Sequence, residues 1–307
     1  MKKFTALGVD VGGTKIAAGV VTFPEGVVRA RREIPTLPRR GGAAVLADME
    51  RLVSDLATEA RSSGGPIEAI GVGVCEIVDR SGNIASANCL DWTSDSVRQR
   101  LSKIAPTAIE ADVRAAARAE AMFGAGRDVD VFLYASIGTG IASCLVIDGQ
   151  PFVGARGATG TMASGLPPGF DEVRASGLPP TLEQFASGPA LVSRFNALHG
   201  NARSGQEVMA AAAAGDERAA RVVRSAAEAL GGTIGWLVNV LDPELVVLGG
   251  GLGVSRGLYR DTLIDSARRR IWWEGHRDLP IVPAMTGPDA GLIGAAAFAV
   301  HTCRSLR

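Results

Sequence analysis

Residues 5–21 read Thr-Ala-Leu-Gly-Val-Asp-Val-Gly-Gly-Thr-Lys-Ile-Ala-Ala-Gly-Val-Val, and this stretch decides the fold. An apolar run with β-branched residues reaches Gly12-Gly13, and a second apolar run, residues 16–21, leaves the two glycines. Two such runs joined by a short glycine turn predict a β-hairpin.

The predicted turn carries groups that suit a phosphate and its metal ion. Gly12 and Gly13 lack a Cβ, so the backbone can come close to a ligand. Thr14 adds a hydroxyl, Lys15 adds a positive charge, and Asp10 adds a carboxylate at the strand end. A Walker A loop is excluded because that motif opens a helix, whereas here a strand follows. Gly-Gly-Thr alone fits an ordinary hairpin turn equally well, so the prediction depends on Asp10 and on the motifs described below.

Composition limits the class of partner. The 307 residues are 47% apolar, enough to form one large domain or two lobes with packed cores. The 32 basic and 32 acidic side chains balance, which gives no electrostatic case for binding nucleic acid or an anionic membrane. We therefore expect a small-molecule partner. With no signal-peptide pattern and no apolar run long enough to span a bilayer, the sequence predicts a cytoplasmic protein.

The cysteines and histidines do not form a recognisable motif. Four cysteines are scattered without a Cys-x-x-Cys pair, which argues against a disulfide framework and against a zinc site. The three histidines lie outside the glycine-rich and acidic motifs, so a histidine-dependent mechanism is disfavoured. These residues are Cys75, Cys89, Cys144, Cys303, His199, His276 and His301.

Two carboxylates follow apolar strand patterns in the first half of the chain. Strands are predicted over 27–34, 67–74 and 106–110, and helices over 43–61 and 113–123. Ligand groups in α/β sheets collect where strands end, which makes Glu76 and Asp112 candidates. Glu76 fits a solvated strand end equally well. Asp112 could cap the following helix, or could accept a proton from a substrate hydroxyl, and one residue can do both.

The second half repeats the first motif. Strands predicted over 129–136 and 141–147 flank Gly138-Thr139-Gly140, so two glycine-threonine turns suggest two duplicated lobes that each offer backbone N–H groups to a polyphosphate. Residues 154–181, rich in glycine and proline, predict a loop over a cleft. A strand over 244–248 meets Gly249-Gly250-Gly251 before a helix predicted over 255–270, an arrangement typical of nucleotide binding. Further helices are predicted over 182–185, 189–198, 205–214, 216–241 and 290–301, and a closing strand over 281–284.

Taken in order, these pieces resemble the sugar kinases of the ROK family, within the actin-like ATPase superfamily. The matching motifs extend from residue 8 to residue 295 in the family's order. They are Gly8-Val9-Asp10-Val11-Gly12-Gly13-Thr14-Lys15, Glu110-Ala111-Asp112-Val113-Arg114-Ala115-Ala116, Ser136-Ile137-Gly138-Thr139-Gly140, Leu182-Glu183-Gln184-Phe185-Ala186-Ser187-Gly188, Val247-Leu248-Gly249-Gly250-Gly251 and Asp289-Ala290-Gly291-Leu292-Ile293-Gly294-Ala295.

The resemblance implies a fold and an activity. The expected fold is the two-lobed α/β actin-like ATPase (ribonuclease H-like) fold with a duplicated βββαβα core. A small lobe is expected over residues 1–113, completed by a helix over 290–307, and a larger lobe over 114–289. The implied enzyme transfers the γ-phosphoryl group of ATP, with Mg²⁺, to a hydroxyl of a hexose-like sugar, expected to be the 6-hydroxyl, in a cleft between the lobes. A homodimer is implied by the family alone.

The resemblance also assigns roles to residues. Asp112 falls on the family's catalytic base, and Asp10 is expected to reach Mg²⁺ through phosphate or water. Asn88 and Glu183 match sugar contacts, and Glu76 and Thr161 are expected beside them. The expected ATP-binding residues are Asp10, Gly12, Gly13, Thr14, Lys15, Gly138, Thr139, Gly140, Gly249, Gly250 and Gly251.

The chain departs from the family at the sugar contacts. Where most members have Gly-Glu-x-Gly-His and a cysteine-rich zinc module, residues 160–164 read Gly-Thr-Met-Ala-Ser, and 167–180 contain no cysteine or histidine. Ala111 replaces an asparagine, and Cys75-Glu76 replaces Pro-Gly. The departures imply no zinc and a polyol other than plain glucose. Because Glu76 could pair with an ammonium group, an amino sugar such as kanosamine is expected, in a specialised pathway such as antibiotic biosynthesis.

Alternatives remain open at this point. A valiolone-type cyclitol and ordinary glucose are the other candidate substrates. A non-catalytic sugar-binding regulator with the same fold is the competing class of protein. Retention of Asp10, Asp112 and both glycine-threonine turns favours the kinase.

Overall fold

The glycine turn near the amino terminus joins two paired strands, as predicted. In the computed structural model, which describes residues 3–63, 65–165 and 180–305, β1 (Phe4–Val11) pairs antiparallel with β2 (Lys15–Phe23). Because β1 ends at Val11 and β2 begins at Lys15, residues 12–14 form the turn. The predicted hairpin is confirmed.

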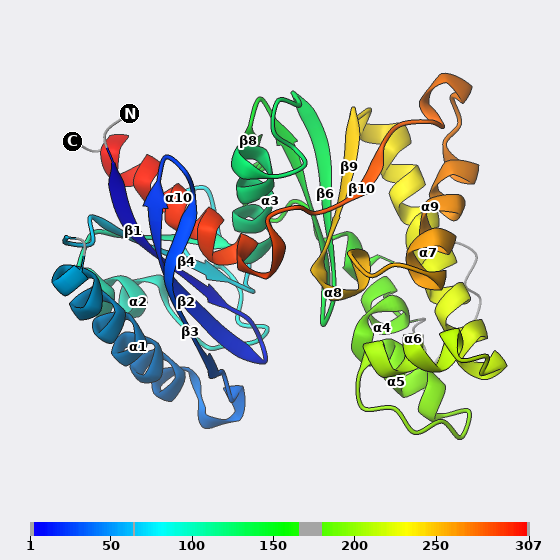
Figure 1. Cartoon of the computed structure of the whole chain (residues 1–307), viewed down its shortest axis with the longest axis horizontal. Helices are drawn as coiled ribbons and strands as arrows, with labels where there is room; N and C mark the ends of the chain where they lie inside the picture. The colour runs from blue at the N-terminus through cyan, green and yellow to red at the C-terminus, as the bar shows by residue number, and fades with distance from the viewer. Residues whose placement is uncertain (1–2, 64, 166–179, 306–307) are drawn as a thin grey trace. The chain divides into compact units, whose positions relative to one another are not determined.

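This hairpin is the start of a five-stranded sheet with the order β3-β2-β1-β4-β5 (Figure 1). The three further strands are β3 (Val27–Pro35), β4 (Ala69–Val74) and β5 (Thr107–Ala111). Because β4 runs parallel to β1, and β5 parallel to β4, the carboxyl ends of these three strands reach the same edge of the sheet. Asp10, Glu76 and Asp112 lie at or just after these ends.

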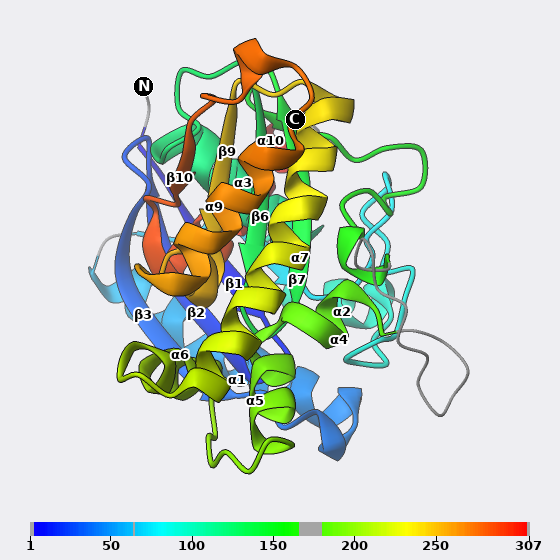
Figure 2. The ribbon, with the colours of Figure 1, turned by 90° about the vertical axis from the view of Figure 1, so that its right-hand side faces the viewer.

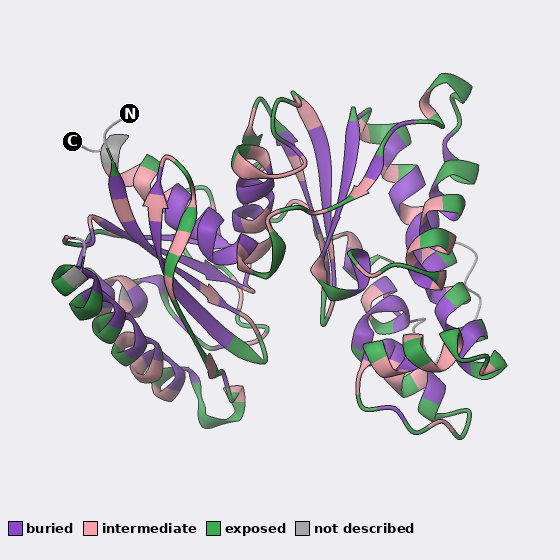
Figure 3. Ribbon diagram, in the orientation of Figure 1, coloured by how far each residue is buried: buried purple, intermediate pink, exposed green. Residues whose placement is uncertain are grey.

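Helices cover both faces of the first sheet. Alternation along β1 turns Leu7 and Val9 toward a core shared with α1 (Gly42–Ser63) and α2 (Ser94–Leu101). Ala6 belongs instead to a core shared with α10 (Ala290–Ser305), next to which α3 (Asp112–Phe123) packs. Figure 3 shows the inner strands of the sheet buried, whereas the edge strand β3 is largely exposed.

A second sheet repeats this arrangement. Its order is β10-β9-β6-β7-β8. When β6 is counted as the first strand and the sheet is read from β8, both sheets have the order third, second, first, fourth, fifth, which agrees with the predicted duplication. The strands are β6 (Val131–Ile137), β7 (Ile141–Ile147), β8 (Gln150–Pro151), β9 (Leu245–Gly249) and β10 (Ile281–Pro283).

Two long helices, α7 (Glu217–Leu241) and α9 (Leu258–Arg270), lie side by side over the second sheet (Figure 2). They approach closely because Gly231 has no Cβ, which would otherwise lie 2.3 Å from the carbonyl oxygen of Leu263. The remaining helices are α4 (Leu182–Ala186), α5 (Gly188–Asn196), α6 (Gly205–Ala213), α8 (Gly250–Gly253), η1 (Pro38–Arg40), η2 (Met162–Ser164), η3 (Glu274–His276) and η4 (Gly287–Asp289).

The chain divides into two compact units, and the division differs from the expected one. The first unit contains Met1–Asp128, Gly149–Thr159 and Met285–Arg307, and the second contains Val129–Asp148 and Gly160–Ala284. The expected boundary after residue 113 would cut α3 from the first unit. The structure keeps α3 there because it packs against α10, where a Cβ on Gly294 would lie 1.7 Å from the carbonyl oxygen of Ala115.

Two further elements differ from the predictions. Helix α2 was not predicted; its sequence is mostly polar, and Thr93 caps its start by accepting a hydrogen bond from the Ser96 amide. The helix expected over 255–270 is present as α9, and the glycine run before it forms a further short helix, α8, that was not predicted. Among the described residues, no helix is both long and apolar enough to cross a bilayer.

Candidate active site

The first glycine turn is held by a threonine that the sequence did not reveal. Thr36 is fully buried; its hydroxyl donates to the carbonyl oxygen of Gly12 at 2.7 Å, and its amide donates to that of Thr14 at 3.0 Å. The amide of Gly12 donates to the carbonyl oxygen of Lys15 at 3.0 Å. Gly13 and Thr14 are exposed at the tip. Hydrogen bonds from Thr36 thus fix the turn, and the tip of the turn is open to solvent.

The ammonium group of Lys15 belongs to a chain of ion pairs. Its Nζ lies 2.9 Å from Oε2 of Glu33, which also contacts Arg31 at 2.9 Å. The Nε of Arg31 lies 2.6 Å from Oδ1 of Asp289, just before α10. Lys15 is exposed, so its ion pair with Glu33 contributes little to stability. Its positive charge lies next to the glycine turn.

Asp10 is the next-to-last residue of β1 and lies beside the start of α10. A Cβ on Gly291 would lie 2.5 Å from Oδ2 of Asp10, so the backbone of α10 passes close to this carboxylate. Burial raises the pKa of Asp10 to about 6; the nearby Lys15 charge lowers it and that of Asp289 raises it. A carboxylate oxygen in this position suits a hard cation such as Mg²⁺.

Asp112 is the first residue of α3 and follows β5. Burial raises the pKa of its carboxyl group to about 7, the Asp10 charge adds to the rise, and the hydrogen bond from the Val113 amide, at 2.6 Å, opposes it. The N-cap position belongs to Ala111, which makes no side-chain capping bond, so Asp112 does not cap the helix in the usual way. A carboxylate with a pKa near neutrality has the proton affinity that a general base needs.

Glu76, which was expected beside the sugar, is hydrogen-bonded to the loop that follows β4. Its Oε1 accepts hydrogen bonds from the amides of Cys89 and Leu90, and its Oε2 accepts from the amide of Asn88 and the hydroxyl of Ser86. Burial alone would raise the pKa of Glu76, but these four hydrogen bonds together lower it. With both oxygens occupied, the carboxylate has no acceptor position left for an ammonium group of a sugar. Asn88, in contrast, is exposed.

The second glycine turn is fixed by the loop and helices that follow it in the same unit. The amide of Gly138 donates to the carbonyl oxygen of Gly140, and the amide of Gly188 donates to that of Gly138, both at 2.9 Å. Oε2 of Glu183, on α4, accepts from the Ile141 amide at 2.8 Å, and a Cβ on Gly140 would lie 3.1 Å from it. Glu183, expected at the sugar, therefore lies directly at this turn.

Thr161, another expected sugar contact, is exposed just before η2, and its carbonyl oxygen accepts a hydrogen bond from the Ser164 hydroxyl at 2.6 Å. The predicted loop over 154–181 falls within the described residues only up to 165 and from 180 onward.

Close packing leaves no room for side chains at Gly249, the last residue of β9, and at Gly250. A Cβ on Gly249 would lie 2.1 Å from the hydroxyl oxygen of Tyr134. Gly250 has φ +73°, and a Cβ there would lie 2.4 Å from the carbonyl oxygen of Ile137. Gly251 is exposed, and the hydroxyl of Ser255 donates to its carbonyl oxygen at 2.6 Å.

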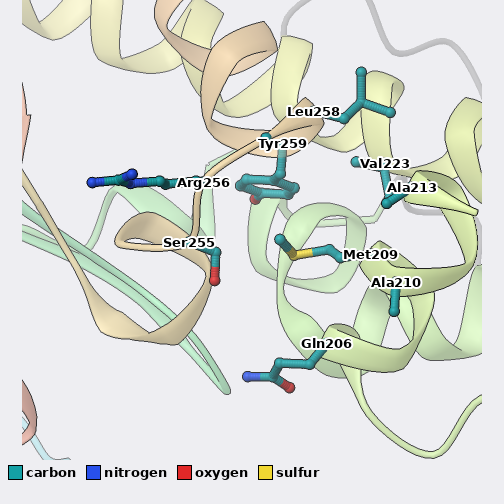
Figure 4. A pocket seen from close by; sticks show the side chains of 10 residues that line it. Gln206, Met209, Ala210, Ala213, Val223, Ser255, Arg256, Leu258 and Tyr259 are labelled. Atoms are coloured by element: carbon teal, nitrogen blue, oxygen red, sulfur yellow. The ribbon is translucent and has the colours of Figure 1, made fainter.

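A cavity of about 350 Å³ opens beside this run (Figure 4). Residues of α6 form one side of it, and residues 255–259 form the other. Gln206 reaches toward the glycine run, since its Nε2 would lie 3.2 Å from a Cβ on Gly251. Tyr259 closes the inner end, with its hydroxyl bonded to the carbonyl oxygen of Ala186 at 2.9 Å. The sequence did not predict this cavity, because α6 and residues 255–259 are far apart in the chain.

Within residues 3–63, 65–165 and 180–305, no three His, Cys, Asp or Glu side chains gather as a metal site would require. The groups that could meet a cation at the first turn are the Asp10 carboxylate and the phosphates of a bound nucleotide.

Residues 6–302 match the model of the ROK family. The chain is 30% identical to a glucokinase of Streptomyces coelicolor, over 95% of this chain and 96% of that protein. It is 28% identical to an N-acetylmannosamine kinase of Yersinia pseudotuberculosis, over 95% and 97%.

A crystal structure of a ROK family glucokinase from Streptomyces griseus, in complex with glucose and AMPPNP, superposes with a TM-score of 0.78 at 28% identity and covers 97% of this chain and 99% of that one. Its likeness agrees with the two mixed five-stranded sheets and the expected actin-like ATPase fold. With glycine-threonine turns, carboxylates at strand ends and a family match across almost the whole length, the chain belongs to the ROK family.

Proposed function

We propose that this protein is an ATP-dependent sugar kinase that transfers the γ-phosphoryl group to a hydroxyl of a hexose-like substrate. The observation that carries the proposal is Asp112, whose carboxyl pKa is raised to about 7 at the start of α3, in the unit that also holds the first glycine turn. Support comes from relatives named as glucokinase and N-acetylmannosamine kinase over nearly their full length.

The two glycine-threonine turns and the glycine run are the proposed ATP contacts. Backbone N–H groups at Gly13–Lys15 and Thr139–Gly140 would donate hydrogen bonds to phosphate oxygens, because the amides of Gly12 and Gly138 are already bonded within their turns. The cavity beside Gly251 is the proposed site of the adenosine, because it is concave, partly apolar and next to exposed backbone. Mg²⁺ would neutralise phosphate charge, and Asp10 is the proposed residue that holds it through phosphate or water.

Asp112 is the proposed general base. Phosphoryl transfer proceeds through a loose transition state, so the protein mainly positions the hydroxyl in line with the phosphate and neutralises charge. The ionised Asp112 carboxylate accepts the proton of the attacking hydroxyl as the oxygen–phosphorus bond forms. Its raised pKa matches this role near neutral pH.

The substrate is proposed to be a modified hexose phosphorylated at its 6-hydroxyl. Residues 160–164, Gly-Thr-Met-Ala-Ser, supply no carboxylate or imidazole to a sugar ring. Kanosamine remains our first candidate, without the ammonium contact to Glu76, and a valiolone-type cyclitol and glucose are the alternatives. Asn88, Thr161 and Glu183 are the proposed sugar contacts. The homodimer rests on the resemblance alone, and a role in antibiotic biosynthesis rests on the departures from the family; both stay predictions.

Coupled measurement of ADP release tests the proposal. The purified protein is assayed with Mg-ATP and each of glucose, N-acetylmannosamine, kanosamine and a valiolone-type cyclitol. We expect turnover with at least one of them, and we expect Asp112→Asn to lower kcat about a hundredfold or more. The matched control is Asp55→Asn, an exposed carboxylate on α1. A sugar-binding regulator would release no ADP with any substrate, which would refute the proposal.

A further inference from the structure

Glu76 is a buried carboxylate that accepts hydrogen bonds from the loop that follows it in the chain. Only 6% of the residue is exposed, directly after β4. Three consecutive backbone amides converge on it, from Asn88 at 2.8 Å, Cys89 at 2.6 Å and Leu90 at 3.0 Å. The Ser86 hydroxyl supplies the fourth hydrogen bond. Four donors match the four lone-pair positions of an ionised carboxylate.

Ser86 extends this arrangement to the side chain of Asn88. Its hydroxyl oxygen accepts a hydrogen bond from the Ile77 amide at 2.9 Å and another from Nδ2 of Asn88 at 3.3 Å. Asn88 is therefore bound twice, through its amide to Glu76 and through its side chain to Ser86. The orientation of the exposed Asn88 side chain depends on the carboxylate.

The same loop adjoins the first glycine turn. A Cβ on Gly13 would lie 3.3 Å from the Sγ of Cys89, so the Cys89 side chain packs directly against the turn proposed to receive phosphate. Cys89 is in turn fixed by its amide on Glu76, at 2.6 Å. A shift of this loop would therefore displace both Asn88, a proposed sugar contact, and the Cys89 side chain that packs against the proposed phosphate-binding turn.

We propose that Glu76 is a positioning residue, which folds Ser86–Leu90 into the loop that presents Asn88 to the sugar and Cys89 to the glycine turn without touching the substrate. The proposal rests on the proposed kinase function for the role of Asn88. It excludes recognition of an ammonium group by Glu76, since an ammonium would compete with donors that already fill both oxygens. Sugar recognition by this loop then comes from the neutral amide of Asn88.

Three variants separate the roles. Glu76→Gln keeps the shape but replaces one acceptor oxygen with a donor that faces other donors. Ser86→Ala removes one donor and keeps the charge. Asn88→Ala removes the presented side chain and leaves Glu76 and its amide partners in place. For each, we would measure local amide hydrogen exchange over residues 86–90, the thermal midpoint, and KM for the sugar and for ATP.

For Glu76→Gln we expect exchange at the amides of 88–90 to become about tenfold faster or more, because hydrogen bonds to a charged acceptor are lost. KM for the sugar should rise about tenfold, whereas exchange in α7 of the second unit should not change. Ser86→Ala should move the same readouts in the same direction by less. Asn88→Ala should raise KM for the sugar with little change in exchange at 89–90.

Glu76→Gln should lower kcat/KM for an amino sugar and for its hydroxyl analogue by the same factor. A loss more than tenfold greater for the amino sugar would overturn the proposal, because Glu76 would then touch the ammonium. Unchanged exchange at 88–90 would also overturn it. If Glu76→Gln does not fold, the exchange data for Ser86→Ala test whether these hydrogen bonds hold the loop, and unchanged exchange at 88–90 in that variant would overturn the proposal. Hydrogen exchange needs no turnover, so failure of the kinase assay would refute the proposed function and still leave the positioning role tested.

Discussion

Arg114 and Glu110 form an ion pair in which Nε lies 2.6 Å from Oε1 and the side chains are only 3% and 4% exposed. The guanidinium also donates to the carbonyl oxygens of Val78, at 2.7 Å, and Gly157, at 2.9 Å. Glu110 is the next-to-last residue of β5 and Arg114 lies in the first turn of α3, so Asp112 lies between the two paired residues in the sequence. The pair therefore joins the helix that carries the proposed base to two other backbone segments of the first unit.

Replacing Arg114 should be strongly destabilising. Arg114→Met leaves the Glu110 carboxylate buried without its partner, and we expect the free energy of unfolding to fall by about 3–5 kcal/mol. Denaturant unfolding followed by circular dichroism measures the change. The control is Arg32→Met, whose pair with Glu59 is exposed and should contribute less than about 1 kcal/mol. Equal effects of the two substitutions would contradict the structural role of the buried pair.

Glu120, near the other end of α3, anchors the segment that leads into α10. Its buried carboxylate accepts hydrogen bonds from the amides of Ala125, Met285 and Thr286 at 2.8–3.0 Å, and from the Thr286 hydroxyl. Glu120→Gln removes part of this acceptor capacity, and we expect a loss of about 2 kcal/mol together with faster exchange of the amides at 285 and 286. Glu217→Gln, at an exposed glutamate, is the control. Protection at 285–286 that survives the substitution would argue against this anchor.

Close contact between β4 and α10 should make two neighbouring glycines respond differently. A Cβ on Gly71 would lie 1.8 Å from the carbonyl oxygen of Ala295, whereas one on Gly73 has 3.5 Å to its nearest neighbour. Gly71→Ala should therefore cost about 3 kcal/mol or more through overpacking, and Gly73→Ala less than about 1 kcal/mol. Thermal melts of the two variants test this difference. Similar midpoints would mean that α10 can move away at little cost.

Periodic and glycine-rich stretches made much of the fold predictable. The alternation in β1 and β2 and the 3.6-residue spacing of α1 depend on neighbours in the sequence, so the sequence alone predicts them. The glycine turns were predictable for a similar reason, because close backbone approach requires glycine. Helix α2 is mostly polar and was missed, since its start depends on the Thr93 cap rather than on an apolar stripe.

The partners of buried polar groups were not predictable. Thr36 lies 24 residues from the Gly12 carbonyl that it binds, and no local pattern marks it. Glu76 appeared to be a candidate ligand because an acidic residue ended a strand, yet its four donors lie 10–14 residues later in a loop without periodicity. Hydrogen-bond satisfaction is a property of the folded chain, which is why the role of Glu76 had to come from the structure.

Activity should depend on pH through Asp112. The base acts in its ionised form, and its pKa is raised to about 7 by burial, with the Asp10 charge adding to the rise. Protonation on lowering the pH therefore removes the active form, and kcat/KM should fall through about pH 7 and level off above it. Rates measured from pH 5 to 9, with ATP and sugar well below saturation, test this dependence. An acid limb near 3.8, the ordinary value for aspartate, would show that Asp112 is more hydrated than the structure implies.

Filling the cavity beside the glycine run should weaken ATP binding selectively. Ala210 lines the cavity from α6 and is exposed, so a larger side chain there can enter the cavity without disturbing a core. Ala210→Leu should raise KM for ATP about tenfold, equivalent to about 1.4 kcal/mol, while KM for the sugar changes less than about twofold. Ala214→Leu, at the exposed residue just past the end of α6 and outside the lining, is the matched control. If KM for ATP is unchanged in Ala210→Leu while the thermal midpoint shows an intact fold, the adenosine must bind elsewhere and the proposed use of this cavity fails.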